Sequence, residues 1–309
     1  MKTMQTRIAM KALSVTTMAL FLFFSSCKEQ DTISFTADDN SDLQSEANID
    51  AQSEEVSDMS GVALSADAGT QTGGRSTDVN GVARNIQSAI TDTRFSCATV
   101  TLEFAADNDP NDPAKIHGYI VIDFGTGCTS PNGRVRKGKI NVEFIGRRFI
   151  PGSSIVITTD GYSVDGIKID GTRTEMNATG STEDAPKFTI TEDVTVTFLD
   201  NTTATRTATR TRTWNRAANP LQDTWTVTGN AFGTTRKGRE YVMTITNPLL
   251  FKRECVILSK LVFPVQGTKE LIVGDKKITT DFGDGTCNVS VTITVNGRSK
   301  TISLSSTGD

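Results

Sequence analysis

The sequence of 309 residues contains one histidine, His117, and only 6% of its residues are aromatic. Zinc enzymes with several histidine ligands and the usual serine or cysteine triads are therefore nearly excluded. We interpret His117 as a strand residue without chemistry. The net charge of −4 and the scarcity of aromatic stacking surfaces also argue against nucleic-acid binding, and no cofactor is expected.

Long hydrophobic runs are lacking beyond the first 26 residues. Those residues carry Lys2, Arg7 and Lys11, no acidic residue, and an apolar run from about Ala12 to Phe24. The run is short for a bilayer-spanning helix and has the layout of a secretory signal. Residues 1–26 are therefore predicted to be a signal peptide, and the protein is predicted to be exported.

The predicted signal ends in Ser25-Ser26-Cys27. Small residues immediately before a cysteine resemble a bacterial lipoprotein signal, which implies that Cys27 is acylated and becomes the first mature residue. Two or more acyl chains, at about 0.8 kcal/mol per buried CH₂, hold a protein stably at a bilayer. We interpret Cys27 as a tether to the outer membrane. The alternative is a plain signal peptide with a chance cysteine.

Residues 27–79 contain twelve acidic residues and two basic ones. This composition predicts a disordered acidic linker. Within it, Lys28-Glu29-Gln30-Asp31 is similar to signals that send some Bacteroidetes lipoproteins to the cell surface, and Asp31-Thr32-Ile33 resembles an O-glycosylation acceptor. The alternative is that these residues merely begin the linker, so the periplasmic and outer faces of the membrane both stay open.

Residues 80–309 are rich in Thr, Val and Ile in alternation, which is typical of half-buried strands. Clear strands are expected at 98–104, 139–144, 187–190 leading into 194–198, 224–228 and 289–295. Asn132-Gly133 and Asn296-Gly297 predict two-residue hairpins. We predict an all-β fold of roughly ten to fourteen antiparallel strands, arranged in hairpins and meanders as one large sheet or a two-layer β-sandwich. A short helix is expected only within 79–90.

Four further cysteines occur in two similar contexts, Cys97 with Cys128 and Cys255 with Cys287. The repetition predicts two related β units, at about 95–148 and 253–305. An antiparallel hairpin brings such positions within bridging reach in an oxidising compartment, so disulfides Cys97–Cys128 and Cys255–Cys287 are predicted. No C-x-x-C spacing exists, so no metal site is expected at these cysteines.

The repeated pattern is Cys, strand, Asp-Phe-Gly-x-Gly-(x)-Cys, strand, Asn-Gly, strand. It is similar to that of a family of uncharacterised Bacteroidetes lipoproteins. The similar region covers about 95–305 and includes 210–214 and 225–229. Since no activity is established for that family, the resemblance implies nothing about catalysis.

The segment from Arg206 to Arg216 alternates basic residues and threonines. Period-two geometry places one set of side chains on one sheet face and the threonines on the other. That set is Arg206, Arg210, Arg212, Trp214 and Arg216. Because guanidinium groups stack on aromatic rings and bind carboxylates and phosphates, the set is a candidate patch for an acidic glycan or a lipid headgroup. The alternative is a solvated face with cross-strand ion pairs.

Two aspartates, Asp123 and Asp281, each precede Phe-Gly and are candidate catalytic carboxylates. Accepting turn hydrogen bonds is the alternative role and is favoured by the repeat. The segment 107–112 begins like a calcium loop with Asp107, Asp109 and Asn111. It lacks the glycine and glutamate of that loop, which favours a polar hairpin loop.

These features favour a membrane-anchored, non-catalytic lipoprotein of the bacterial envelope that binds or scaffolds an acidic glycan or an envelope protein. One alternative is a carboxylate-dependent hydrolase of envelope or extracellular polysaccharide. Another is a lipid carrier, which requires an apolar cleft between sheets.

Overall fold

The computed structural model describes residues 36–70, 81–178, 180–182, 185–255, 263–288 and 290–303. The chain divides into Met1–Ser34 and Phe35–Asp309, and every described residue lies in the second unit. The signal peptide, Cys27 and the two short motifs that follow it lie outside the described residues.

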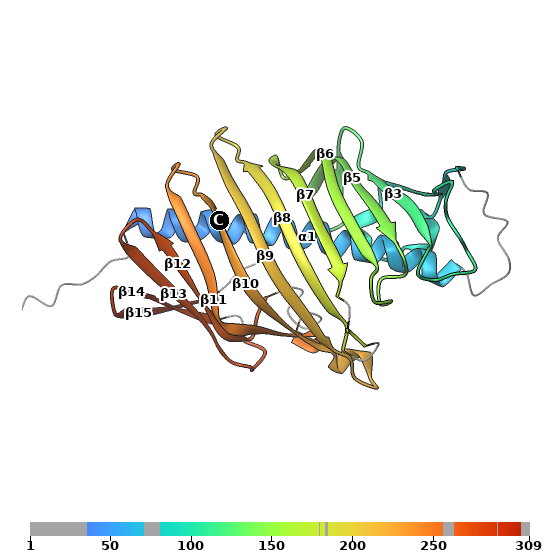
Figure 1. Ribbon diagram of the computed structural model, residues 1–309. Coiled ribbons are helices and arrows are strands. Elements are labelled where there is room, and N and C mark those ends of the chain that lie inside the picture. Colours follow the sequence, from blue (N-terminus) through green and yellow to red (C-terminus); the bar gives the residue numbers. More distant parts are fainter. Residues whose placement is uncertain are drawn as a thin grey trace, which may run out of the picture. The chain divides into compact units, whose positions relative to one another are not determined.

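The strands form one antiparallel sheet of 15 strands (Figure 1). The strands are β1 (Arg84–Asn85), β2 (Thr99–Phe104), β3 (His117–Asp123), β4 (Cys128–Thr129), β5 (Val135–Ile145), β6 (Ser154–Val164), β7 (Ile167–Asn177), β8 (Lys187–Thr197), β9 (Thr203–Asn215), β10 (Thr224–Thr234), β11 (Glu240–Lys252), β12 (Gln266–Val273), β13 (Lys276–Asp284), β14 (Ser290–Val295) and β15 (Arg298–Ser303). Neighbours in the chain are neighbours in the sheet, except that β4 pairs with β5 off the main path. The all-β prediction is confirmed, and of its two forms the protein adopts the single sheet.

The two faces of the sheet differ because side chains alternate along each strand. In β8, Phe188, Ile190 and Val194 are buried, whereas Thr189 and Thr191 are exposed. The buried side chains of β2–β9 form one hydrophobic core and those of β9–β14 form a second. We call the buried side the inner face and the opposite side the outer face.

A helix, α1 (Ala37–Thr70), lies across the inner face, and in Figure 1 it runs behind the strands. The predicted disorder of the acidic linker is therefore wrong for residues 37–70. Ile49, Val56, Met59 and Ala63 recur at intervals of seven, three and four residues, so they lie on one side of the helix and enter the first core. The few apolar residues of α1 are thus enough to anchor it once the sheet supplies the opposite surface.

Two hairpins form the tight turns that their sequences favour. Asn296 and Gly297 have φ of 50° and 78°, and Asp165 and Gly166 have φ of 52° and 84°, as two-residue hairpins of this kind require. The predicted two-residue turn at Asn132-Gly133 is wrong. Only Gly133 has a positive φ there, and its N–H donates to the Ser130 carbonyl in a longer loop.

The expected helix within 79–90 is replaced over 81–90 by β1 and a 3₁₀ turn, η2 (Gln87–Ala89). Two similar turns follow, η3 (Thr93–Phe95) and η4 (Pro220–Gln222). They connect strands without adding a second layer to the sheet.

Both predicted disulfides are present. Cys97 is joined to Cys128 and Cys255 to Cys287, with Cα atoms 5.5 Å and 5.1 Å apart. The first lies beside β2–β5 and the second beside β12–β14, near the two ends of the strand order. The related units therefore open and close the sheet, as their places in the sequence predict.

Candidate functional site

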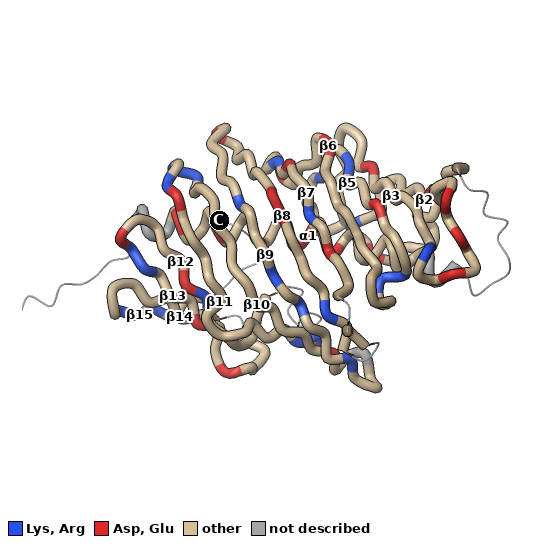
Figure 2. Tube along the Cα trace, in the orientation of Figure 1, with Lys and Arg blue, Asp and Glu red and all other residues tan. Residues whose placement is uncertain are grey.

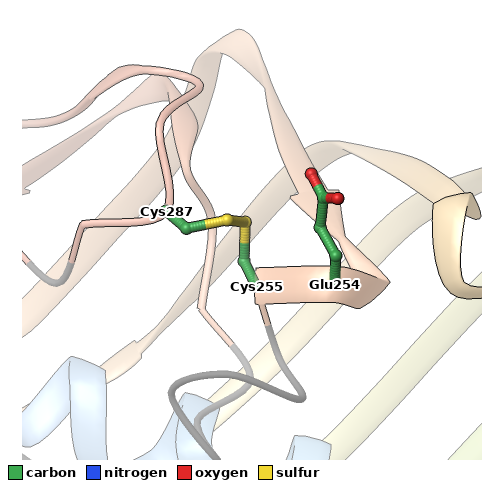
Figure 3. A group of neighbouring side chains, drawn as sticks. All are labelled: Glu254, Cys255 and Cys287. Carbon is green, nitrogen blue, oxygen red and sulfur yellow. A yellow bond between two sulfur atoms is a disulfide. The ribbon is translucent and has the colours of Figure 1, made fainter.

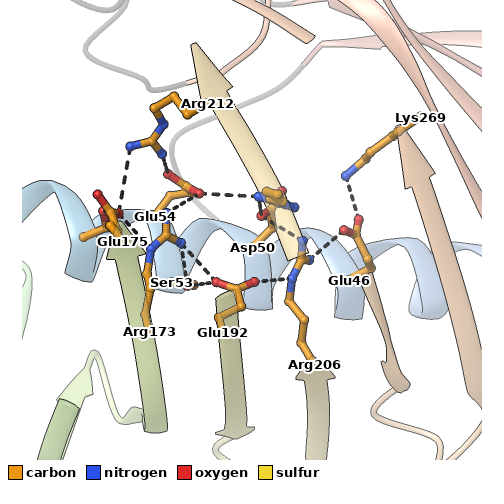
Figure 4. A network of polar contacts seen from close by, with 12 residues as sticks. Glu46, Asp50, Ser53, Glu54, Arg173, Glu175, Glu192, Arg206, Arg212 and Lys269 are labelled. Atoms are coloured by element: carbon orange, nitrogen blue, oxygen red, sulfur yellow. Dashed lines mark hydrogen bonds and ion pairs between the residues drawn. The ribbon is translucent and has the colours of Figure 1, made fainter. Parts of the chain in front are cut away.

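The most concentrated polar cluster lies between α1 and the inner face, and Figure 4 shows its central part. Arg206 on β9 is completely buried. Its Nε donates to Glu192 Oε1 on β8 at 2.6 Å, and its Nη1 donates to Glu46 Oε1 on α1 at 2.9 Å. Asp50 Oδ1 lies 3.3 Å from its Nη2. Three carboxylates thus surround one guanidinium.

The neighbouring arginines extend this arrangement along β9. Arg210 Nη1 is 2.8 Å from Asp50 Oδ1, and Arg212 Nη2 donates to Glu54 Oε2 at 2.7 Å. Asp50 and Glu54, one helical turn apart on α1, thus each pair with an arginine of β9.

Arg173 on β7 joins the strands to each other and to the helix. It donates to Glu175 Oε1, Glu192 Oε2 and Glu54 Oε1 at 3.0, 3.0 and 3.1 Å. Ser53 and Ser57 on α1 donate to Glu192 and Glu175 at 2.5 Å. Figure 2 shows the acidic and basic positions on the adjacent strands β7–β9. We call this set, with the helix acids 42–58 and their sheet partners, the ionic interface.

The ionic interface continues toward both ends of α1. Lys269 on β12 donates to Glu46 at 2.6 Å, and Arg239 near the start of β11 contacts Asp42. At the other end Arg136 contacts Glu55, and Arg94 donates to Asp58 at 2.6 Å. The helix is therefore bound to strands from β5 to β12.

The pKa values of Glu175 and Arg206 are shifted by their neighbours in the ionic interface. Burial opposes ionisation of Glu175, but Arg173, Arg212 and Arg148 lower the pKa of this carboxyl well below its usual value. Burial likewise opposes the charge of Arg206, yet Asp50, Glu192 and Glu46 raise its pKa. These two directions favour the charged form of both side chains.

The predicted ligand patch is divided by this arrangement. Arg206, Arg210 and Arg212 share a face, as predicted, but they are buried against the helix, so they offer no open surface to an acidic ligand. The alternative of a face with ion pairs describes these arginines better. Most of their carboxylate partners come from α1, however, rather than from neighbouring strands.

The remaining two members of the patch contact aromatic rings. Trp214 stacks on Trp225, and Trp225 stacks on Phe251, with ring centroids 5.0 Å and 5.3 Å apart. The exposed Arg216 lies over Phe149, 5.2 Å from the ring centroid. These contacts fit the stacking expected of tryptophan and arginine.

The aspartates proposed as a catalytic pair are not together. Eight strands lie between β3 and β13 in the sheet order, and Figure 1 shows these two strands near opposite ends of the sheet. Asp123 accepts from the Gly125 N–H at 2.7 Å and Asp281 from the Gly283 N–H at 2.8 Å. Both carboxylates therefore have the turn role that the repeat favours.

The candidate calcium segment forms the loop between β2 and β3. Asp109 accepts from the Asn111 N–H at 3.0 Å, which is a turn contact rather than a ligand arrangement. Asp107 Oδ1 lies 2.7 Å from His117 Nδ1, and Glu143 Oε1 lies 3.1 Å from His117 Nε2. His117 is thus a strand residue that ties this loop to β5.

One cluster of three metal-type ligands occurs among the described residues, namely Glu254, Cys255 and Cys287 (Figure 3). Its two sulfur atoms form the second disulfide and have no thiolate to offer a metal ion. Glu254 alone could not hold a cation.

One small cavity lies between α1 and the sheet. It is lined by Ser53, Val56 and Ile157, among others, and has a volume of about 10 Å³, which is the size of one water. This cavity is far too small for the acyl chain of a lipid.

No family model matches the sequence, no curated protein matches it significantly, and no solved structure is significantly similar to it. Among the described helices, none is both long enough and apolar enough to cross a membrane.

Sequence reasoning missed the acidic half of the ionic interface. The signal was present, because Asp42, Glu46, Asp50, Glu54 and Asp58 are spaced by four residues, which aligns them on a helix. The composition of the segment pointed to disorder instead, because a polar, acidic stretch is also typical of disordered chains.

Proposed function

We propose that this protein is an exported, non-catalytic lipoprotein of the bacterial envelope, held by acyl chains on Cys27, whose β-sheet body binds or scaffolds an envelope component. The main support is the leader, which begins with basic residues, continues as an apolar run and ends in Ser25-Ser26-Cys27. The resemblance of the repeated cysteine pattern to Bacteroidetes lipoproteins supports the same assignment.

The body supports a binding or scaffolding role. Its large sheet is stiffened by a helix bound through buried ion pairs and by a disulfide near each end. The two carboxylates that a hydrolase was expected to use lie far apart in the sheet order and accept turn hydrogen bonds. Polysaccharide hydrolysis by that pair is therefore disfavoured.

Intact-mass spectrometry of the mature protein from its native membrane tests the anchor. We expect a chain that begins at Cys27, carries fatty acids, and is four hydrogens lighter than the reduced form because two disulfides are present. Cys27→Ser is the matched control and should leave the leader uncleaved or the product without acyl chains. A wild-type protein that retains residues 1–26 or lacks fatty acids contradicts the proposal. Protease treatment of whole cells then identifies the membrane face.

A further inference from the structure

The outer face carries a surface that the ionic interface does not use. On β9 the threonines Thr205, Thr207, Thr209 and Thr211 alternate with the side chains that face α1. In Figure 1 this outer face is toward the viewer over the middle of the sheet, because α1 lies behind it. Threonine is stiff at χ1, so its methyl and hydroxyl groups are presented with little loss of entropy on binding.

At one level of the sheet these hydroxyls form a row across neighbouring strands. Thr189 on β8 is the register partner of Thr211 on β9, which is the partner of Thr228 on β10. The pairing of β10 with β11 shifts between Val227 and Asn230, where the β11 segment 245–248 bulges.

The row resumes on β11 at Thr246, whose Oγ1 lies 2.6 Å from Thr268 Oγ1 on β12. Thr268 is the register partner of Asp281 on β13, which pairs in turn with Thr292 on β14. Thr292 is the partner of Thr301 on β15. We call the row from Thr189 to Thr301 the hydroxyl track.

The hydroxyl track is long and almost uncharged. It takes one residue from each of the strands β8–β15, and strands spaced by about 4.8 Å give it a length of roughly 34 Å along the sheet. Asp281 is its one charged member, and no lysine or arginine belongs to it. Such a surface fits an extended polymer without charge better than an acidic one.

The two related units differ at the end of the track. In the first unit Asp123 is the register partner of Lys139, whose Nζ lies 3.4 Å from Asp123 Oδ2. In the second unit Thr292 stands opposite Asp281, where the first unit has that lysine. Threonine is shorter than lysine and uncharged, so this position supplies no ion pair to Asp281.

A depression of about 510 Å³ lies at this point on the outer face. Its lining residues are Asp281, Gly283, Asp284, Asn288, Ser290, Thr292 and Thr301, and the two carboxylates among them disfavour an acidic ligand. Carboxylate, amide and hydroxyl groups together offer both hydrogen-bond donors and acceptors, which is what the hydroxyl groups of a sugar require.

We propose that the outer face of β8–β15 binds an uncharged polysaccharide laid across the strands along the hydroxyl track, with one sugar seated in the depression beside Asp281. The inference rests on the proposed binding role and gives it a ligand class. Because neighbouring strands are twisted relative to one another, a flexible chain can follow the track whereas a rigid crystalline surface cannot.

Affinity electrophoresis of the acylated mature protein in detergent tests this, with dextran, mannan or laminarin in the gel and polygalacturonate as the acidic comparison. We expect at least one neutral polysaccharide to retard the wild type and polygalacturonate not to. Thr292→Lys places a lysine opposite Asp281, as in the first unit, and should weaken binding at least tenfold. Thr211→Lys with Thr228→Lys should do the same from the middle of the track.

Thr158→Lys, on the outer face of β6 outside the track, is the matched control and should bind like the wild type. Circular dichroism checks that each variant is folded. If one of the two track variants does not fold, the other still tests the proposal. The proposal is overturned if no neutral polysaccharide retards the protein, if only polygalacturonate does, or if both track variants bind normally. An acylated protein that binds no polysaccharide refutes this inference and leaves the lipoprotein assignment intact.

Discussion

Arg206 shows how the ionic interface stabilises the protein at the scale of one residue. A buried charge is costly unless it is paired and hydrogen-bonded. Arg206 meets this condition with carboxylates from α1 and from β8, so it joins the helix to two adjacent strands.

Arg206→Met should lower the free energy of unfolding by about 3–5 kcal/mol, because removing one partner leaves buried carboxylates incompletely paired. Urea denaturation measures the loss. Arg216→Ala, at an exposed position directly after the same strand, removes a cation–π contact and should cost no more than about 1 kcal/mol. If both variants lost the same free energy of unfolding, the burial of Arg206 would contribute nothing beyond an exposed contact.

At the scale of elements, α1 depends on the sheet. Most helices draw their stability from packing rather than from intrinsic propensity. In α1, Asp42, Glu46, Asp50, Glu54 and Asp58 form four like-charge pairs at i,i+4, which together oppose an isolated helix by roughly 1–2 kcal/mol. The basic side chains of the sheet reverse the sign of this effect.

Acid should therefore act oppositely on the isolated segment and on the whole protein. A peptide of residues 37–70 should gain helix in circular dichroism as the pH falls from 7 to 3, because protonation removes the repulsion. The whole protein should lose stability over the same range. The pKa of Glu175 is lower in the folded state than its value of about 4.3 in an unfolded chain, so the stability it contributes is present above that value and lost below it.

Glu175→Gln is the control for the whole protein. It should be less stable at pH 7, and its free energy of unfolding should fall less steeply between pH 5 and pH 3 than that of the wild type. If the free energy of unfolding of the variant fell as steeply with pH as that of the wild type, Glu175 would not contribute to the acid sensitivity. A peptide that is already strongly helical at pH 7 would show that α1 does not need the sheet.

At the scale of the whole molecule, the sheet is a meander in which each strand contacts its immediate neighbours. Interactions in such an array are passed from one element to the next, so the two ends are the places where unfolding begins most easily. The disulfides lie near these ends and restrain them.

Replacing Cys255 and Cys287 by serine should lower stability by roughly 3–4 kcal/mol, from loss of the restraint on a loop of about thirty residues. Hydrogen exchange should accelerate in β12–β14 and stay nearly unchanged in β6–β8. The mirror variant, with Cys97 and Cys128 replaced, should accelerate exchange in β2–β5 instead. Uniform acceleration across the sheet would mean that the molecule unfolds as one cooperative unit.

Much of this architecture is predictable from local pattern. The alternation in 289–295 and the Asn296-Gly297 turn are short-range signals, and the hairpin of β14 and β15 follows from them. The cysteine pairs followed from an internal repeat, which supplies a comparison within one chain. The Asn132-Gly133 turn was predicted wrongly because the same dipeptide also fits a longer loop, and the hydrogen bonds of Ser130 decide between them.

By itself, the sequence determined the strands, the disulfide pairing and the face of β9 on which the arginines lie. Only the tertiary structure decided what that face meets. Glu46 and Arg206 are separated by 160 residues, and neither has a local signal that names the other. An acidic segment is disordered or helical according to whether a complementary surface removes its charges from water, and that surface exists only after the strands have assembled.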